Sequence, residues 1–221
     1  MTANVGNFSA RVRPGRAQKA PMVRYLRHVT SMPEDMTPRP LILPVRGLAP
    51  RFGADCWLAP NATVVGDVVM GEGCSIWFQA VVRGDVNATR IGNRVNIQDG
   101  AVIHCTYQRS ETTIGDDVSI GHKAIIHGCT IERDVLVGMG AIVMDGAIIG
   151  SGSVIAAGAV VLEGTVVEPG SVFAGVPARK VKSVSPELME GQVRRISRNY
   201  LMYSGWFRTD TDGQDTTHGL P

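Results

Sequence analysis

Aliphatic side chains return at every sixth position along most of the chain, and a small or β-branched residue follows many of them four positions later. An α-helix cannot use this period, because 3.6 residues per turn would scatter the apolar side chains around its surface. Very short strands joined by tight corners can use it. The longest unbroken series comprises Ile131, Val137, Val143, Ile149, Ile155, Val161, Val167 and Phe173.

Three such hexapeptides close one triangular coil, and stacked coils bury the aliphatic column in their centre. Glycine or an acidic residue commonly follows the aliphatic position, as expected at corners with unusual backbone angles. The pattern therefore predicts an all-β fold, a parallel β-helix of hexapeptide repeats.

The repeat is interrupted in three places. Three extra residues fall between positions 82 and 91, and five fall between positions 103 and 114, so we expect two loops. The step between positions 126 and 131 is one residue short. Each hexapeptide forms one of the three faces of a coil. If the loop residues are not counted as a further face, the aliphatic residues at 103 and 126 lie on the same face of successive coils.

This count brings two histidines together. His104 and His127 each follow an aliphatic residue of that face, so their imidazoles should stack roughly 5 Å apart, the spacing of neighbouring strands. The same count places Arg83 one coil below His104. His122 belongs to the neighbouring face and cannot join this column, but in a trimer of identical chains it could complete the pair of an adjacent subunit.

Three neutral imidazoles with an open fourth position suit a catalytic Zn²⁺, which lowers the pKa of its bound water toward about 7. The alternative is that each histidine is a solvated or backbone-bonded side chain on a β-helix edge. His28 and His218 lie outside the repeat and are not ligand candidates. Cys105 and Cys129 lie close to the histidines, but we expect them to pack in the core.

Composition narrows the function. The chain has 26 glycines and only 5% aromatic residues, which suits many thin, similar layers, and its net charge of +2 is too small to indicate nucleic-acid binding. No apolar run approaches the ~20 residues of a membrane span, and no signal peptide is visible. The four cysteines lack a C-x-x-C pair, which argues against a zinc ribbon. We therefore expect a cytoplasmic protein with no membrane and no nucleic-acid partner.

Basic charge is concentrated at the N-terminus. Residues 1–40 carry seven Arg or Lys and two Asp or Glu, which leaves 15 basic and 18 acidic residues for the rest of the chain. This segment is predicted to be a poorly ordered arm. Two interpretations remain open: a targeting peptide, or a nonessential extension with Met22 or Met36 as the true start.

The remaining chain divides into three parts. Residues 41–182 are predicted to form the β-helix and residues 183–207 a C-terminal α-helix, with 208–221 as a flexible tail. Ser185 can cap the helix and Pro186 suits its first turn.

Five segments point to a known family: "VVRGD" at 81–85, "NIQDG" at 96–100, "VIH" at 102–104, "IGHKAIIHG" at 120–128 and "GVPARKV" at 175–181. Together they resemble the γ-class carbonic anhydrases, which are left-handed parallel β-helix proteins. The resemblance covers roughly residues 42–205.

The resemblance implies a homotrimer with metal sites at its subunit interfaces. It implies that His104 and His127 of one subunit and His122 of the next hold Zn²⁺, with Fe²⁺ or Co²⁺ as alternatives. A metal-bound hydroxide would attack CO₂ to give bicarbonate.

The resemblance also assigns roles to polar residues near the histidines. Gln98 matches the residue that hydrogen-bonds the metal-bound water, and Asn96 lies beside it. Arg83, Asp85 and Asp99 match an ion-pair network of the family. The alternative for both aspartates is ordinary corner chemistry, and we favour a structural role at the interface for them.

The sequence departs from the family's best-known pattern in the residues that pass the proton to solvent. The position after Arg-Gly-Asp, a glutamate in the archetype, is Val86, and the acidic loop is replaced by "CTYQRSETT" at 105–113. Tyr200 of the C-terminal helix is a candidate substitute, with plain packing as the alternative.

Two other functions fit the repeat. A hexapeptide-repeat acyltransferase would use a coenzyme A thioester, with His122 or His104 as general base, but would not need three converging histidines. A non-catalytic scaffold would use the metal only to staple the trimer.

Overall fold

The structure is a computed structural model that describes residues 39–208. The predicted N-terminal arm and C-terminal tail therefore fall almost entirely outside the described residues. Within the described part, short strands follow one another and are succeeded by one helical segment. The strands are β1 (Leu41–Leu43), β2 (Arg51–Phe52), β3 (Trp57–Leu58), β4 (Thr63–Met70), β5 (Ser75–Ile76), β6 (Val81–Ile91), β7 (Asn96–Ile97), β8 (Val102–His104), β9 (Thr112–Ile114), β10 (Ser119–Ile120), β11 (Ile125–His127), β12 (Thr130–Ile131), β13 (Leu136–Val137), β14 (Ile142–Val143), β15 (Ile148–Ile149), β16 (Val154–Ile155), β17 (Val160–Val161), β18 (Val166–Val167), β19 (Ser171–Ala174) and β20 (Arg179–Ser183).

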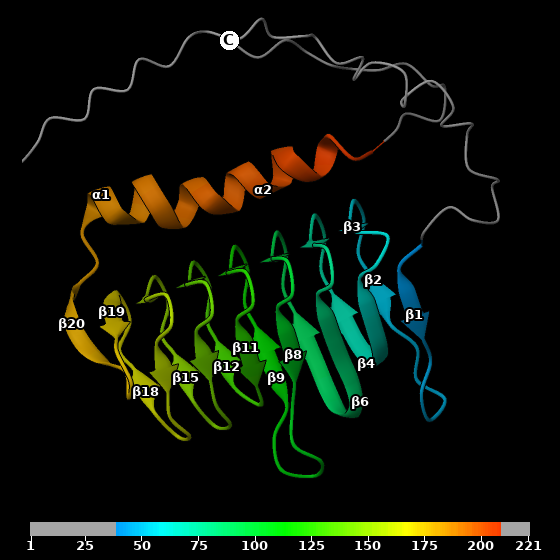
Figure 1. Ribbon diagram of the computed structural model, residues 1–221, viewed down its shortest axis with the longest axis horizontal. Helices are drawn as coiled ribbons and strands as arrows, with labels where there is room; N and C mark the ends of the chain where they lie inside the picture. The colour runs from blue at the N-terminus through cyan, green and yellow to red at the C-terminus, as the bar shows by residue number, and fades with distance from the viewer. Residues whose placement is uncertain (1–38, 209–221) are drawn as a thin grey trace, which may run out of the picture. The chain divides into compact units, whose positions relative to one another are not determined.

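The strands stack as successive coils around one axis (Figure 1). Strands of neighbouring coils pair in parallel, and among the strands of residues 39–208 only β20 runs antiparallel to its partner, β19. One sheet follows the order β17-β14-β11-β8-β6-β9-β12-β15-β18 and the other the order β20-β19-β16-β13-β10-β7-β5-β3. The predicted all-β fold, a parallel β-helix of hexapeptide repeats with a C-terminal helix, is confirmed.

The β-helix has three faces, because the long strand β6 serves two of them. Its first residues pair with β8 and its last residues pair with β9. One face therefore carries β8, β11, β14 and β17, and we call it the β8/β11 face. A second carries β9, β12, β15 and β18, and the third carries the strands of the other sheet.

The predicted aliphatic column forms the core. Ile97, Ile103, Ile120 and Ile126 are each 0% exposed. Within a two-residue strand the side chains point to opposite sides, so that Ile149 is fully buried whereas Ile148 is 40% exposed. The short strands thus bury one aliphatic side chain per hexapeptide.

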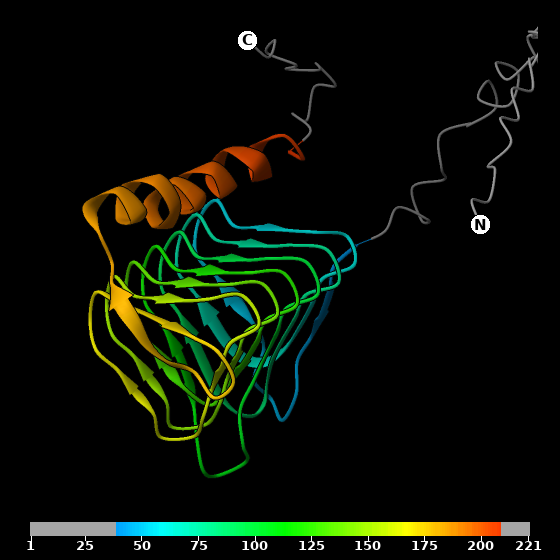
Figure 2. The ribbon, with the colours of Figure 1, turned by 60° about the vertical axis from the view of Figure 1, so that its left-hand side comes forward.

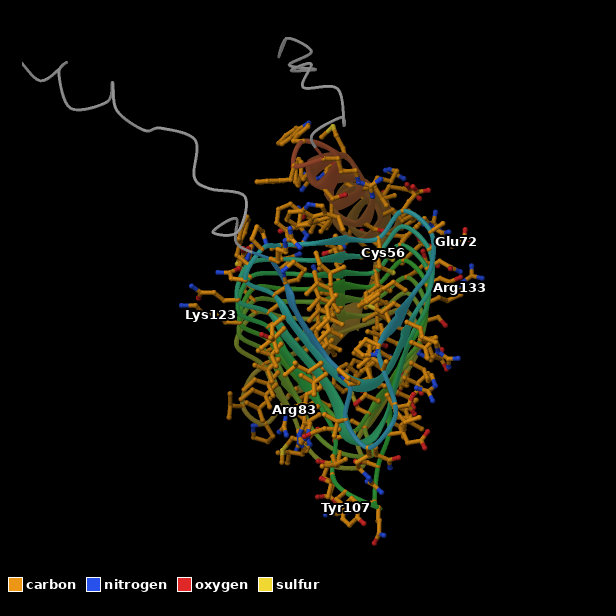
Figure 3. The ribbon with its side chains drawn as sticks, turned by 90° about the vertical axis from the view of Figure 1, so that its right-hand side faces the viewer. Cys56, Glu72, Arg83, Tyr107, Lys123 and Arg133 are labelled. Atoms are coloured by element: carbon orange, nitrogen blue, oxygen red, sulfur yellow. The ribbon has the colours of Figure 1, made fainter. Side chains whose placement is uncertain are left out.

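One predicted loop is present and the other is not. Residues 105–111 leave the β-helix between β8 and β9, and Tyr107 lies far out on this loop (Figure 3). The prediction of a loop between positions 82 and 91 is wrong, because β6 is a continuous strand there. The pairing of β4 with β6 shifts between Gly66 and Val68, so the extra residues form a bulge that keeps the backbone hydrogen bonds of both flanks.

Two stacked glycines make this bulge possible. Gly66 pairs with Gly84 across the two coils. A Cβ atom on Gly84 would lie 2.4 Å from the backbone oxygen of Asp67, which is far inside van der Waals contact. The glycine between Arg83 and Asp85 is therefore required by close approach of the backbone.

The C-terminal helix begins as predicted. Ser185 is the N-cap, its side chain accepts a hydrogen bond from the backbone N–H of Leu188 at 3.2 Å, and Pro186 opens the first turn. The segment then consists of α1 (Pro186–Leu188), the π-helical turn η2 (Met189–Arg194) and α2 (Arg195–Gly205). The π-helical turn was not predicted.

This helical segment runs along one face of the β-helix (Figure 2). Val193 is buried with Val154 and Val172 of that face. Tyr200 meets Trp77 edge to face, with ring centroids 5.0 Å apart. In the described part of the chain, no helix is long and apolar enough to cross a membrane.

Replacing the cap should loosen the helix. We expect Ser185→Ala to lower the free energy of unfolding by about 1 kcal/mol, because the first turn loses its side-chain acceptor. Urea denaturation followed by circular dichroism measures this loss. Ser183→Ala, at an exposed serine of β20, is the control and should change stability by less than about 0.5 kcal/mol. Equal losses in the two variants would contradict the capping role.

Candidate functional site

Three residues of the predicted column lie where the count placed them. His104 of β8 and His127 of β11 are directly paired in register, and their ring centroids lie 5.3 Å apart. Arg83 comes from β6 in the preceding coil, and its Nη2 lies 3.4 Å from Nδ1 of His104. The predicted stack of two imidazoles above an arginine is confirmed.

A carboxylate contacts each of these imidazoles. Oδ1 of Asp85 lies 3.2 Å from Nε2 of His104, and its Oδ2 pairs with Arg83 at 2.6 Å. Oδ2 of Asp145 lies 2.7 Å from Nδ1 of His127. A carboxylate holds the facing ring nitrogen as an N–H donor, so the unprotonated nitrogens are Nδ1 of His104, which Arg83 also approaches, and Nε2 of His127. We call these five residues the two-histidine cluster.

Nδ1 of His104 and Nε2 of His127 lie 3.3 Å apart, and Nη2 of Arg83 lies 3.4 Å from the same Nδ1. Two acceptors at this distance repel unless a proton or a cation lies between them. Two nitrogens bound to one tetrahedral Zn²⁺ at 2.0–2.1 Å would lie about 3.3–3.4 Å apart. The two-histidine cluster therefore fits a metal ion of this kind.

The protonation of the cluster also suits a cation. Burial lowers the pKa of His104, and the positive charge of Arg83 lowers it further, so this imidazole is neutral at pH 7. Burial alone would raise the pKa of Asp145, but hydrogen bonds from Ser110 and His127 outweigh it and lower that pKa to about 2. A neutral imidazole backed by an ionised carboxylate is the usual state of a histidine that ligates a metal.

The third histidine lies at a different corner of the coil. His122 is in the turn between β10 and β11, and its Nδ1 lies 2.7 Å from Oδ2 of Asp99. Its Nε2 lies 3.4 Å from the hydroxyl of Tyr200 on α2. Asp99 is therefore a partner of His122 in this chain, whereas Asp85 is the partner of Arg83. Figure 3 shows the separation, because Arg83 and Lys123, the neighbour of His122, mark two corners.

A chain of amides lies next to His122. Oε1 of Gln98 accepts a hydrogen bond from the backbone N–H of His122 at 3.2 Å. Nε2 of Gln98 donates to Oδ1 of Asn96 at 2.9 Å, and Asn96 donates to Ser119 at 2.8 Å. Gln98 is only 5% exposed and Asn96 only 1%, so their orientations are fixed. With Asp99 and Tyr200, these residues form the one-histidine cluster, whose members are Asn96, Gln98, Asp99, His122 and Tyr200.

A single chain thus offers two imidazoles at one corner and one at another. Among residues 39–208, no three His, Cys, Asp or Glu side chains gather as a metal ion requires. Cys105 and Cys129 are buried, and burial raises the pKa of Cys129 to about 12. This thiol stays protonated at neutral pH and does not offer a thiolate ligand.

The surface between the two clusters is apolar. The outward side chains of the β8/β11 face form one column, in which each residue is paired in register with the next. Val102 and Ile125 are 36% and 39% exposed. On the face of β9, β12, β15 and β18, the outward residues of the first coils are instead Arg90, Thr113 and Thr130, and those of the later coils are aliphatic. The column comprises Val81, Val102, Ile125, Ile142 and Val160.

Sequence reasoning missed Asp145 and Ser110. Asp145 carried a signal, since it lies 18 residues after His127, which is one undisturbed coil of three hexapeptides. Ser110 carried none, because it lies in the loop where the repeat gives no register.

Comparisons with known proteins agree with this architecture. Residues 50–84 and 128–163 match the family "Bacterial transferase hexapeptide (six repeats)", and residues 111–144 match "Hexapeptide repeat of succinyl-transferase". The chain is 43% identical over 171 residues to a carbonic anhydrase of Geobacillus kaustophilus, covering 76% of this chain and 91% of that protein. It is 36% identical over 158 residues to gamma carbonic anhydrase 2, mitochondrial, of Arabidopsis thaliana, covering 69% of this chain and 56% of that protein.

A solved structure is also similar. A hexapeptide transferase family protein from Anaplasma phagocytophilum superposes with a TM-score of 0.73 at 36% identity, covering 76% of this chain and 98% of that chain. Transferase names and carbonic anhydrase names thus occur on the same fold, so the site must discriminate between them.

Proposed function

Because the chain belongs to the γ-class carbonic anhydrase family, we propose that it is a carbonic anhydrase-like enzyme that converts CO₂ to bicarbonate at a metal site shared between subunits of a homotrimer. One observation carries this proposal. The unprotonated nitrogens of His104 and His127 lie 3.3 Å apart, and each imidazole is held from its other nitrogen by a carboxylate.

His104 and His127 of one subunit and His122 of the next would hold the metal, with Zn²⁺ favoured and Fe²⁺ or Co²⁺ as alternatives. When bound, such a metal supplies a nucleophile at neutral pH by lowering the pKa of its water. The residues support this assignment, because Asp99 contacts Nδ1 of His122 and leaves Nε2, which lies 3.4 Å from the Tyr200 hydroxyl, as the unprotonated nitrogen. All three imidazoles are therefore oriented by carboxylates.

The apolar column supports the trimer. It lies on the face that the two clusters flank, and exposed aliphatic surface of this kind favours association with a like surface. Burial of the β8/β11 face against a neighbour would bring the one-histidine cluster of one chain toward the two-histidine cluster of another. The site and the assembly would then depend on the same face.

Gln98 and Tyr200 have the groups needed around the reacting atoms. The amide nitrogen of Gln98 has a second N–H beyond the one given to Asn96, and this N–H can orient a water or a CO₂ oxygen. Burial raises the pKa of Tyr200 to about 12. Its hydroxyl therefore stays neutral. It can relay a proton only if it donates its own proton while its oxygen accepts another. Its contact with Trp77 is the alternative, structural role.

The site favours this function over acyl transfer from coenzyme A. A general base presents one lone pair to the acceptor hydroxyl or amine. Here the unprotonated nitrogens of His104 and His127 lie 3.3 Å apart instead, which suits a shared cation. A non-catalytic protein in which the metal only stabilises the trimer would have the same ligands. Only a measurement of CO₂ hydration distinguishes it from the enzyme.

Metal analysis and CO₂ hydration test the proposal. We expect the full chain, purified and supplied with Zn²⁺, to retain about one metal ion per subunit and to hydrate CO₂ in stopped-flow assays. His122→Ala should lower both metal affinity and hydration by at least about 100-fold, because it removes a ligand. A wild-type protein that retains no metal would overturn the proposal. Metal without hydration would favour the scaffold, and acetyl transfer without metal would favour the acyltransferase.

A further inference from the structure

Asp145 is bound to its histidine differently from Asp85. The carboxylate of Asp85 is shared between Arg83 and His104. Among the ion pairs of residues 39–208, Asp145 takes part only in the one with His127. Its side chain is 15% exposed. Its second oxygen accepts a hydrogen bond from the hydroxyl of Ser110, in the loop of residues 105–111.

Ser110 is itself held from three sides. Its Oγ donates to Asp145 and accepts a hydrogen bond from the backbone N–H of Thr106 at 3.0 Å. Its carbonyl oxygen accepts a hydrogen bond from Nδ2 of Asn87 at 2.8 Å. A hydroxyl has one proton to give, and the bond from Thr106 occupies a lone pair, so the proton is directed to the carboxylate.

Gly128 leaves room for this arrangement. It follows His127 directly and has a φ of +54°, in the left-handed region. A Cβ atom at this position would lie 2.1 Å from Oγ of Ser110 and 2.3 Å from Oδ1 of Asp145. A side chain at position 128 would therefore occupy the space in which Ser110 and Asp145 meet. The glycine of the "IIHG" segment is explained by this meeting.

A second contact holds the loop over the same corner. Arg109 pairs with Glu163. The register of β14 with β17 extends to place Glu163 beside Asp145 in the next coil. The loop is thus attached to one coil before the histidine pair, through Asn87, and to two coils after it.

We propose that Ser110 and Asp145 are positioning residues for His127, so that the loop of residues 105–111 sets the orientation and tautomer of one metal ligand. Asp145 accepts the Nδ1 proton and thereby directs the Nε2 lone pair toward His104. Ser110 occupies the other carboxylate oxygen and prevents the carboxylate from rotating away. This inference rests on the proposed role of His127 as a ligand. It gives the loop that replaces the family's acidic loop a role unrelated to proton export.

Metal affinity and the His127 tautomer test the proposal on the full chain. We expect Ser110→Ala and Asp145→Asn to weaken Co²⁺ and Zn²⁺ binding by roughly 10–100-fold in chelator competition. In metal-free protein labelled with ¹⁵N-histidine, His127 should carry its proton on Nδ1 in the wild type and lose this preference in both variants. Ser110→Thr keeps the hydroxyl and should restore wild-type values.

Arg109→Ala is the matched control, because it releases the loop from Glu163 but leaves the hydroxyl of Ser110 in place. It should weaken metal binding by less than about threefold, which corresponds to less than about 0.7 kcal/mol. Unchanged affinity and an unchanged His127 tautomer in Ser110→Ala and Asp145→Asn would overturn the positioning role. If the wild type binds no metal, the proposed function fails, while the NMR measurement still decides whether Asp145 and Ser110 set the tautomer.

Discussion

A randomly assembled mixture of two inactive variants should regain about a quarter of the wild-type metal content and CO₂ hydration, if each site draws its ligands from two subunits of a closed ring. The variants are His122→Ala and His127→Ala. Each alone leaves every site one ligand short. Together they can complement each other, because one variant retains the histidine pair and the other retains the single histidine.

The size of the recovery follows from the ring. Each site takes His104 and His127 from one subunit and His122 from the next. A trimer with both kinds of chain therefore contains one complete site out of three. Random assembly of equal amounts makes about three quarters of the trimers mixed, which leaves about one quarter of all sites complete. Co-expression of the two variants with different tags, followed by tandem purification, isolates the mixed trimers, in which the complete sites should rise to about one third.

A site within one chain and a site shared between subunits predict different recoveries of metal content and CO₂ hydration. If one chain formed a complete site by itself, neither variant would rescue the other and the mixture would stay inactive. The control mixes His127→Ala with a chain that carries both substitutions. Neither chain then retains the pair of His104 and His127, so no site can be complete and nothing should be recovered. Recovery in that control would contradict the assignment of the ligands.

The stack of His104 on His127 could be predicted because the β-helix converts sequence distance into spatial position. Once the hexapeptides are counted, the strand spacing fixes the separation of two residues in successive coils. The same count separated His122 from the pair. What the count cannot give is which nitrogen of each ring is free, since Asp85 and Asp145 determine that by direct contact.

The errors occurred where the chain leaves the period. Between positions 82 and 91 the extra residues stay in β6 as a bulge, because paired backbone groups are retained there and stacked glycines allow close approach. Ser110 lies in a loop whose path depends on contacts with Asn87 and Asp145, which are far from it in the sequence. Local periodicity contains no information on such contacts.

Removal of one core side chain should destabilise the β-helix strongly. We expect Ile149→Ala to lower the free energy of unfolding by about 2–5 kcal/mol, because the side chain is fully buried and its loss leaves a cavity between coils. Ile148→Ala, one residue earlier on the same strand, should cost less than about 1 kcal/mol, since its side chain is 40% exposed. Urea denaturation at one fixed subunit concentration measures both values.

The comparison of Ile148 with Ile149 also tests which face is free of subunit contacts. Ile148 belongs to the face of β9, β12, β15 and β18, which the proposed trimer leaves exposed, whereas Ile125 belongs to the β8/β11 face. Ile125→Ala should therefore cost more than Ile148→Ala, and its cost should depend on subunit concentration because it weakens association. If Ile148→Ala were as costly as Ile149→Ala, its side chain would have to be buried in the assembled protein. The subunit contacts would then include the face of β15, and the trimer proposed here would be wrong even if the β-helix itself were right.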